Sequence, residues 1–181
     1  YEATLFVYAL VMNRQPILQD DSVILTPLQQ DEFEELLAVA SDPLIWAQHP
    51  NPDRWKREIF RTYFDGALAS GGAFMIRDKA HRNAIGSTRF YDHDAEASEI
   101  KIGYTFFSRN QWGNGTNQRV KKLMLDHAFQ YVRQVIFHVG AQNMRSRIAM
   151  QRLGAELIGE EEVAYFGEQP KRNVVFRITA P

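Results

Sequence analysis

The chain has 181 residues, of which 45% are hydrophobic, and its 12 Phe, 7 Tyr and 3 Trp are sufficient for one sizeable core. The formal net charge is −1 and the 21 Lys and Arg residues are dispersed, which disfavours nucleic acid and anionic membrane as direct partners. The absence of cysteine excludes disulfides, a thiol nucleophile and a thiolate metal site. The five histidines show no metal-binding spacing, so the sequence predicts no metal site.

The first twelve residues are largely apolar, but they do not resemble a targeting segment. They carry Glu2, have no basic leader, and are far shorter than the ~20 residues that span a bilayer. We expect residues 1–12 to be an N-terminal extension, with Met12 as a candidate biological start, and residues 13–181 to form a single domain. With neither signal nor anchor, the expected location is cytoplasmic.

From Ser22 onward, hydrophobic periodicity predicts a series of short elements. A strand at 23–26 precedes helices at 31–40 and 54–70, which a proline-rich loop separates. Strands follow at 73–77, 84–91 and 99–107, then a glycine-rich turn and a long helix, a strand at 135–139, a helix at 145–153, and strands at 155–165 and 173–179. Strands mixed with helices in this order predict an α/β or α+β fold.

The glycine-rich turn at 111–118 is the most informative segment, because it joins an alternating strand to the long helix. Glycine lets the backbone approach an anion closely, and the free N–H groups of a first helical turn hold phosphate. Neither the P-loop pattern nor the G-x-G-x-x-G dinucleotide fingerprint is present, which disfavours nucleoside triphosphates and NAD. The turn therefore favours another diphosphate, the alternative being that Asn114-Gly115 only caps a structural helix.

A second polar segment follows the buried strand at 135–139. Asn143 and Ser146 have the spacing of a helix N-cap, which is a sufficient structural explanation on its own. Arg147, Arg152 and Lys121 are long cations that could reach phosphate groups, although solvated helix faces are commoner for such residues.

Together these segments resemble the GNAT superfamily of acetyl-CoA-dependent N-acetyltransferases, and within it the branch of ribosomal-protein N-terminal acetyltransferases. The resemblance runs from about Ser22 to Arg177 and is strongest over 102–107, over 112–117 with Lys121, and over 143–147 leading to 152–155. The general pattern Q/R-x-x-G-x-G/A is met in part, because Trp112 and Asn117 stand at its first and last positions. These departures resemble one sub-branch, which carries W-G-x-G-x-N-x-x-x-K.

The resemblance implies a mixed, mostly antiparallel central sheet with helices on both faces and a splayed parallel strand pair that holds acetyl-CoA as cosubstrate. The pantetheine would pair with the strand edge at 104–108, and the diphosphate would lie on the glycine turn. Phe106 and Phe107 could also be core residues, since only their backbone is needed for this contact. The implied cofactor-binding residues are Tyr104, Thr105, Phe106, Phe107, Trp112, Gly113, Asn114, Gly115, Thr116, Asn117, Lys121, Asn143, Ser146, Arg147 and Arg152.

The chemistry implied is direct acetyl transfer to a primary amine in a ternary complex, since neither a Cys nor a nucleophile-elbow Ser is present to form an acyl-enzyme. Ser146 would lie near the sulfur, where a hydroxyl stabilises or protonates the leaving thiolate. Glu99 is the general base we expect if one is used, with a surface strand position as the alternative. Trp46, His49 and Trp55 are expected to line the acceptor site.

The acceptor is expected to be a protein or peptide N-terminal α-amine or a small amine. An α-amine is roughly a tenth to a fifth neutral at pH 7, whereas a lysine amine is almost wholly protonated. Two other functions stay open: a CoA-binding regulator without transferase activity, and an acyltransferase that uses succinyl-CoA. Acetyl-CoA and the amine are the expected partners, nucleic acid and membrane are not, and a homodimer is left open.

Overall fold

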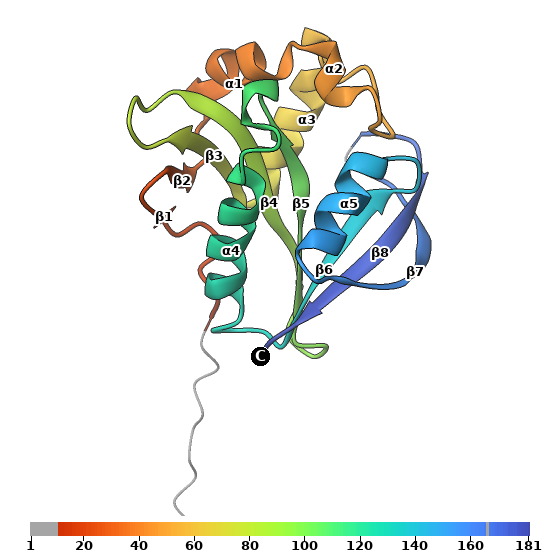
Figure 1. The fold of residues 1–181 in the computed structure, drawn as a ribbon. Helices are drawn as coiled ribbons and strands as arrows, with labels where there is room; N and C mark the ends of the chain where they lie inside the picture. The colour runs from red at the N-terminus through yellow and green to blue at the C-terminus, as the bar shows by residue number, and fades with distance from the viewer. Residues whose placement is uncertain (1–10, 166) are drawn as a thin grey trace, which may run out of the picture.

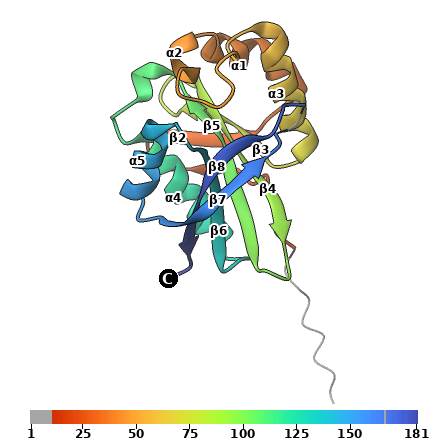
Figure 2. The same ribbon diagram turned by 90° about the vertical axis from the view of Figure 1, so that its right-hand side faces the viewer.

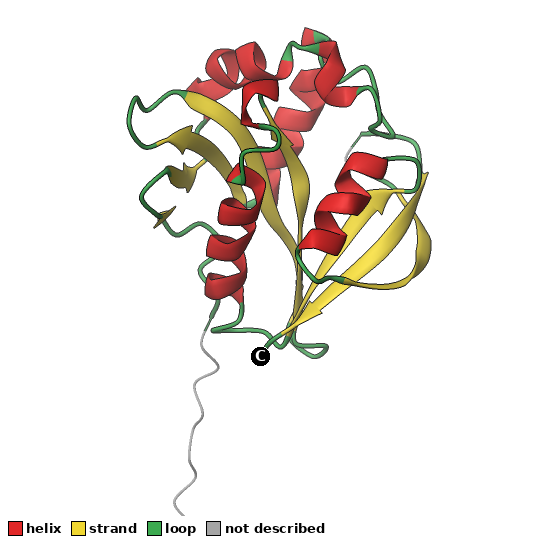
Figure 3. Ribbon diagram, in the orientation of Figure 1, coloured by secondary structure: helices red, strands yellow, loops and turns green. Residues whose placement is uncertain are grey.

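The computed structural model describes residues 11–165 and 167–181, so most of the expected N-terminal extension lies outside the described part. Figure 1 shows the elements in chain order and Figure 3 separates helices from strands. The strands are β1 (Leu18–Gln19), β2 (Val23–Pro27), β3 (Ala73–Asp78), β4 (Ala84–Asp94), β5 (Glu99–Phe107), β6 (Gln134–Gly140), β7 (Glu156–Val163) and β8 (Lys171–Thr179). The helices are α1 (Phe33–Ala40), α2 (Pro43–Trp46), α3 (Arg57–Ser70), α4 (Thr116–Ala128) and α5 (Met144–Arg152), with 3-10 turns at Gln30–Glu32 and Arg109–Gln111.

Within the described residues, the strands form one eight-stranded sheet in the order β1-β2-β3-β4-β5-β6-β8-β7. The paired strands are antiparallel except for β5 and β6, which run parallel. The expected mixed, mostly antiparallel sheet with one parallel pair is confirmed. At the β7 edge, the register of β7 against β8 shifts between Leu157 and Gly159, which leaves Ile158 as an extra residue in β7.

Helices cover both faces of the sheet because successive strand residues point to opposite sides. In β3, Phe74 and Ile76 join the core beneath α4 and α5, whereas Ala73 and Met75 join the core beneath α1, α2 and α3. Figure 2 shows α4 and α5 on one side of the sheet and α3 on the other. Each face therefore has its own hydrophobic core.

Most predicted elements are present, and some boundaries differ where a backbone turn precedes the helix. The helix expected from Arg54 begins at Arg57, because the Lys56 N–H donates to the Asp53 carbonyl at 2.9 Å and Lys56 is extended. The short helix α2 lies inside the expected proline-rich loop and begins with Pro43 at its first turn. Met12, at the end of the expected extension, is buried in the core beneath α4 with 6% of its surface exposed.

Candidate active site

The parallel strands β5 and β6 pair along only a short stretch and then diverge, as Figure 1 shows. Only Glu99–Lys101 of β5 pairs with Gln134–Ile136 of β6. A cavity of about 310 Å³ opens between the strands beyond this point. This volume is at the lower end of the range for small-molecule sites. The β5 edge that faces β6 is therefore left without a neighbouring strand along the cavity.

Tyr104 forms a bulge in β5 at the cavity. Its φ is 53°, and the register of β4 against β5 shifts between Ser87 and Arg89. The Tyr63 hydroxyl donates to the Tyr104 carbonyl at 2.7 Å, and the Arg89 guanidinium lies 3.7 Å from the centre of the Tyr104 ring. These contacts from α3 and β4 hold an unfavourable backbone conformation in place.

The glycine turn presents the N-terminus of α4 to the same cavity. Gly115 is the N-cap of α4 with φ 87° and offers no capping side chain, although Oδ1 of Asn114 accepts from the first helical N–H, that of Thr116. Gly113 also has positive φ, and a Cβ atom at either glycine would meet nothing within 4 Å. Open space beside the remaining N–H groups of the first turn suits a bound anion. The side chain of Asn114 bonds to the N–H and hydroxyl of Thr116, so these two residues shape the turn from behind.

Helix α5 supplies the wall opposite the glycine turn. Asn143 is its N-cap, and its Oδ1 accepts from the Ser146 N–H at 3.2 Å. Arg152 lines the cavity, whereas the Arg147 guanidinium turns back to the Ala141 carbonyl at 3.0 Å. Arg145, which the sequence did not single out, lies over the Trp112 ring at 3.9 Å and brings a further cation to the cavity.

The structure brings together most of the residues proposed from the sequence. Of the residues expected to bind the cofactor, those that line the cavity are Tyr104, Thr105, Phe106, Phe107, Trp112, Gly113, Gly115, Asn117, Lys121, Asn143, Ser146 and Arg152; of those expected near the acceptor, Trp46 and His49 line it. Those that do not line it are Asn114, Thr116, Arg147, Trp55 and Glu99. Trp55 is partly exposed and packs against the Lys56 ammonium instead.

The structure does not bring Glu99 to the cavity. Glu99 begins β5 where that strand still pairs with β6, and its Oε2 accepts from Gln134 Nε2 at 3.0 Å. The strands separate only after Lys101, so the cavity lies further along β5. Placing a general base at Glu99 is therefore not supported by the geometry.

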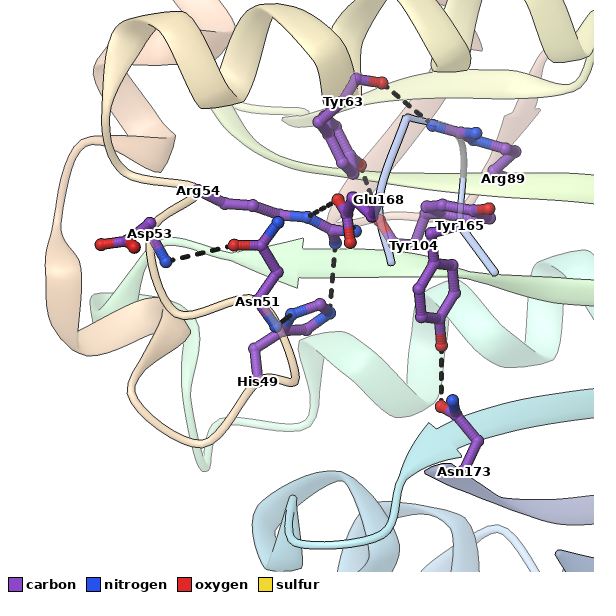
Figure 4. Close-up of polar contacts among 10 residues, drawn as sticks. All are labelled: His49, Asn51, Asp53, Arg54, Tyr63, Arg89, Tyr104, Tyr165, Glu168 and Asn173. Atoms are coloured by element: carbon purple, nitrogen blue, oxygen red, sulfur yellow. Dashed lines mark hydrogen bonds and ion pairs between the residues drawn. The ribbon is translucent and has the colours of Figure 1, made fainter. Parts of the chain in front are cut away.

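The end of the cavity beside Trp46 and His49 is built around a buried arginine, as Figure 4 shows. Arg54 is 1% exposed and donates to one oxygen of Glu168 from Nε at 3.0 Å and from Nη2 at 2.7 Å. Its Nη1 lies 3.1 Å from Nε2 of His49. Burial, and then the Arg54 charge, hold the pKa of His49 well below its usual value, so this ring is neutral. Aromatic rings of Trp46, Tyr63, Tyr104 and Tyr165 surround the guanidinium.

Sequence analysis missed several cavity residues that lie inside predicted apolar strands or loops. His138, Arg54 and Tyr165 line the cavity, and Arg89 and Tyr91 lie behind it. Polar residues inside an apolar strand were the available signal, as with Arg89 in β4 and His138 in β6. No group of three or more His, Cys, Asp or Glu within residues 11–165 and 167–181 could hold a metal ion. In the same ranges, no helix is long and apolar enough to cross a membrane.

A sheet opened between two parallel strands, with a helix N-terminus beside the opening, is the architecture of an acyl-CoA-dependent N-acyltransferase. The family profile described as acetyltransferase (GNAT) domain matches residues 22–156 of the chain. The chain belongs to the GNAT acetyltransferase family.

Solved structures of other acetyltransferases share this fold at low sequence identity. A probable GNAT acetyltransferase from Chromobacterium violaceum matches with a TM-score of 0.79 at 19% identity, over 99% of this chain and 95% of its own. A structure described as a ribosomal-protein-serine acetyltransferase from Vibrio cholerae matches with a TM-score of 0.72 at 16% identity, over 93% of this chain and 100% of its own. A microcin self-immunity acetyltransferase in complex with acetyl-CoA and AMP matches with a TM-score of 0.72 at 13% identity, over 89% and 94%. No curated protein matches the chain.

Lys121 has a different environment from the one expected of a phosphate-binding cation. It is 2% exposed, and its Nζ donates to the Thr105 hydroxyl at 2.6 Å and lies 3.4 Å from that of Thr88. Burial lowers the pKa of this ammonium to about 7. Lys121 thus ties α4 to the strand beside the bulge.

We expect Lys121→Met to remove a pH dependence of stability. The unfolded lysine titrates near 10.4, so between about pH 7 and pH 10 the unfolded state holds a proton that the folded state lacks. Below about pH 7 folding must bury the charged ammonium, so its full free-energy cost opposes folding. At higher pH the folded lysine is neutral, and this cost of folding becomes smaller. Wild-type stability should therefore rise relative to the variant by up to about 1.4 kcal/mol per pH unit across this window.

Chemical denaturation of both proteins from about pH 6 to about pH 10 measures this difference. Lys122→Met is the matched control, because the Lys122 side chain is 74% exposed and its removal should leave the pH dependence unchanged. If the free energies of unfolding of the wild type and of Lys121→Met change equally between about pH 7 and pH 10, the ammonium of Lys121 is not buried as described.

Proposed function

We propose that the protein transfers an acetyl group from acetyl-CoA to a primary amine by direct attack in a ternary complex. The observation that carries this proposal is that the open edge of β5 and the N-terminus of α4 face one cavity. A strand edge offers unpaired backbone groups to amides, and a helix N-terminus offers N–H groups to an anion. Coenzyme A carries both kinds of group in one molecule: its pantetheine amides can pair with the strand edge, and its diphosphate can lie at the helix N-terminus.

The diphosphate would lie against the backbone of residues 113–118. Gly113, Gly115, Asn117 and Gln118 line the cavity there, and the glycines leave room for close approach. Arg145 and Arg152 are the cations best placed to meet the nucleotide, because both line the cavity. Lys121 keeps to the hydroxyls of β4 and β5, so its proposed role shifts from phosphate binding to support of the strand.

Ser146 is our candidate for the group near the leaving sulfur. It lines the cavity, and the bond from its backbone N–H to Oδ1 of Asn143 fixes its place in the first turn of α5. Attack of the neutral amine on the thioester carbonyl forms the C–N bond, and the C–S bond then breaks to release CoA thiolate. A hydroxyl at this position would stabilise the thiolate or give it a proton.

The proposed acceptor is a protein or peptide N-terminal α-amine or a small amine. An α-amine has a larger neutral fraction at pH 7 than a lysine amine, which favours unassisted attack. The structural neighbour described as a ribosomal-protein-serine acetyltransferase supports a peptide N-terminus at the level of fold alone. We further propose that residues 13–181 form a single catalytic domain, in the cytoplasm. A homodimer remains compatible with this proposal.

We expect the wild-type protein to release CoA from acetyl-CoA when a free amine is supplied. The panel comprises peptides with a free N-terminus, the same peptides with a blocked N-terminus, and small amines, each followed by thiol detection and mass spectrometry. Acetylated product from free amines but not from blocked peptides lacking other amines would support the proposal. Tight acetyl-CoA binding without release would favour a CoA-binding regulator, and faster release from succinyl-CoA would favour the other acyl donor.

We expect Gly115→Ala to weaken acetyl-CoA binding by about tenfold, the order expected when an anion loses its contact with a helix N-terminus. At φ 87°, a side chain strains the backbone and moves the amides that would face the diphosphate. Gly71→Ala is the matched control, because Gly71 also has positive φ and lies at the end of α3. Calorimetric titration with acetyl-CoA should find wild-type affinity in Gly71→Ala and reduced affinity in Gly115→Ala. Equal affinities in the two variants would show that the diphosphate does not bind at the glycine turn.

We expect Ser146→Ala to lower kcat while acetyl-CoA affinity stays within a few fold of the wild type. The hydroxyl acts where charge develops on sulfur, so its loss affects the transition state more than the bound ground state. Asn143→Ala is the comparison, because it removes the cap of α5 and should reduce binding and turnover together. If Ser146→Ala loses acetyl-CoA affinity and turnover to the same extent, the serine has a structural role only.

A further inference from the structure

His138 is an ionisable residue of β6 whose function is not explained by the binding of the donor. It lies inside the strand Gln134–Gly140, two residues past the last pairing of β6 with β5. The side chain is 4% exposed and lines the cavity. The imidazole is therefore shielded from bulk solvent but can contact a ligand bound in the cavity.

Glu161 fixes the orientation of this imidazole. The Glu161 carboxylate reaches across β8 from β7 and is bonded to Nε2 of His138, and the Glu161 side chain is 51% exposed. A carboxylate only accepts hydrogen bonds when ionised, so Nε2 must carry the proton. In the neutral ring this leaves a lone pair on Nδ1, which is the arrangement that makes an imidazole a base oriented by a carboxylate.

Nδ1 of His138 is the ring nitrogen that faces β4, whereas the ring as a whole lines the cavity. Its neighbour there is the Tyr91 hydroxyl at 3.5 Å, which is at the outer limit of a hydrogen bond. The Tyr91 ring reaches this position by crossing Gly103, where a Cβ atom would lie 3.1 Å from the ring. The same ring packs edge-on against Tyr104, with the ring centres 5.1 Å apart. Nδ1 therefore lies beside the bulge.

Burial keeps His138 unprotonated. Loss of solvent lowers the pKa of the ring, and the positive charge of Lys101 lowers it further. The charges of Glu161 and Asp92 raise the pKa of the ring, but Asp92 is itself paired with Lys101 at 3.0 Å. The outcome is a pKa below the usual value for histidine, so the basic form predominates at neutral pH.

Three other candidate bases, His49, Lys121 and Glu99, are engaged elsewhere or lie outside the cavity. Nδ1 of His49 accepts from the Asn51 N–H at 2.9 Å, and its Nε2 faces the Arg54 guanidinium. Lys121 bonds to hydroxyls on the face of the sheet that α4 covers. Glu99 lies outside the cavity.

We infer that His138, held by Glu161, is the general base that removes the proton from the acceptor amine during acetyl transfer. This inference rests on the proposed function. As the amine nitrogen bonds to the thioester carbon, its proton passes to Nδ1 and the ring becomes an imidazolium paired with Glu161. The C–S bond breaks, CoA leaves as the thiolate, and the imidazolium returns its proton to solvent while the thiolate is protonated. His138 is thus a catalytic residue and Glu161 a positioning residue.

The first test is His138→Gln, with kcat/KM measured against pH on the best free amine. The wild-type rate should rise with pH as the imidazolium loses its proton, and rise again as the amine loses its own. In the variant the first rise should disappear, and the rate near pH 7 should fall about a hundredfold or more. Acetyl-CoA affinity should stay within a few fold of the wild type. His93→Gln is the matched control, because His93 is an exposed histidine of β4.

The second test is Glu161→Gln, which keeps a half-exposed side chain of the same size and so avoids disturbing the fold. Loss of the carboxylate charge should move the first rise of the pH profile to lower pH, since Glu161 raises the pKa of the ring. The rate at neutral pH should fall about tenfold because the ring tautomer is no longer fixed. A merely structural role for Glu161 would leave the pH profile where it is.

The outcomes separate this inference from the proposed function. If wild type releases no CoA with any amine, the acetyltransferase proposal fails. If wild type is active and both variants keep the wild-type rate and pH profile, the assignment of His138 fails alone. If His138→Gln does not fold, the shift of the profile in Glu161→Gln decides, and an unshifted profile rejects the dyad.

Discussion

The site depends on the divergence of two parallel strands after a short paired stretch. Beyond Lys101 and Ile136, β5 and β6 no longer satisfy each other's backbone groups, and unpaired N–H and C=O groups at a sheet edge have to find other partners. Met150 of α5 and Val120 of α4 belong to the core beneath the opening, so helices on that face support the strands on both sides. The opening of the cavity is therefore set by the sheet and its supporting helices.

Local signals in the sequence predicted the turn and the helix cap that line the cavity, and tertiary contacts decided the rest of its lining. The glycine turn and the Asn143 cap lie within single strand-turn-helix segments, where spacing alone fixes the geometry. Glu99 was placed on the correct strand, but where the paired stretch ends depends on the partner strand. The Arg54–Glu168 pair joins residues 114 positions apart, and no local pattern could have indicated it.

Buried cations give the cavity an electrostatic character that the net charge of −1 conceals. Arg54 has a carboxylate partner, whereas Arg89 and Lys121 are buried against aromatic rings, a carbonyl and hydroxyls. Cation–π contacts and neutral hydrogen bonds recover part of the cost of removing a cation from water. Arg89 from the α3 side and Lys121 from the α4 side contact Tyr104 and Thr105, so they support the bulge from both faces of the sheet.

The extra residue in β7 decides which side chains of that strand can reach β6. With Ile158 bulged out, Glu161 lies opposite Asn173 and shares a face of the sheet with His138. Regular pairing continued from Leu157 would instead place Glu161 opposite Arg172, on the other face. Because β7 is an edge strand, a slip of one residue leaves both hydrophobic cores intact. The position of the bulge at Ile158 therefore determines whether Glu161 lies on the face of the sheet from which it can pair with His138.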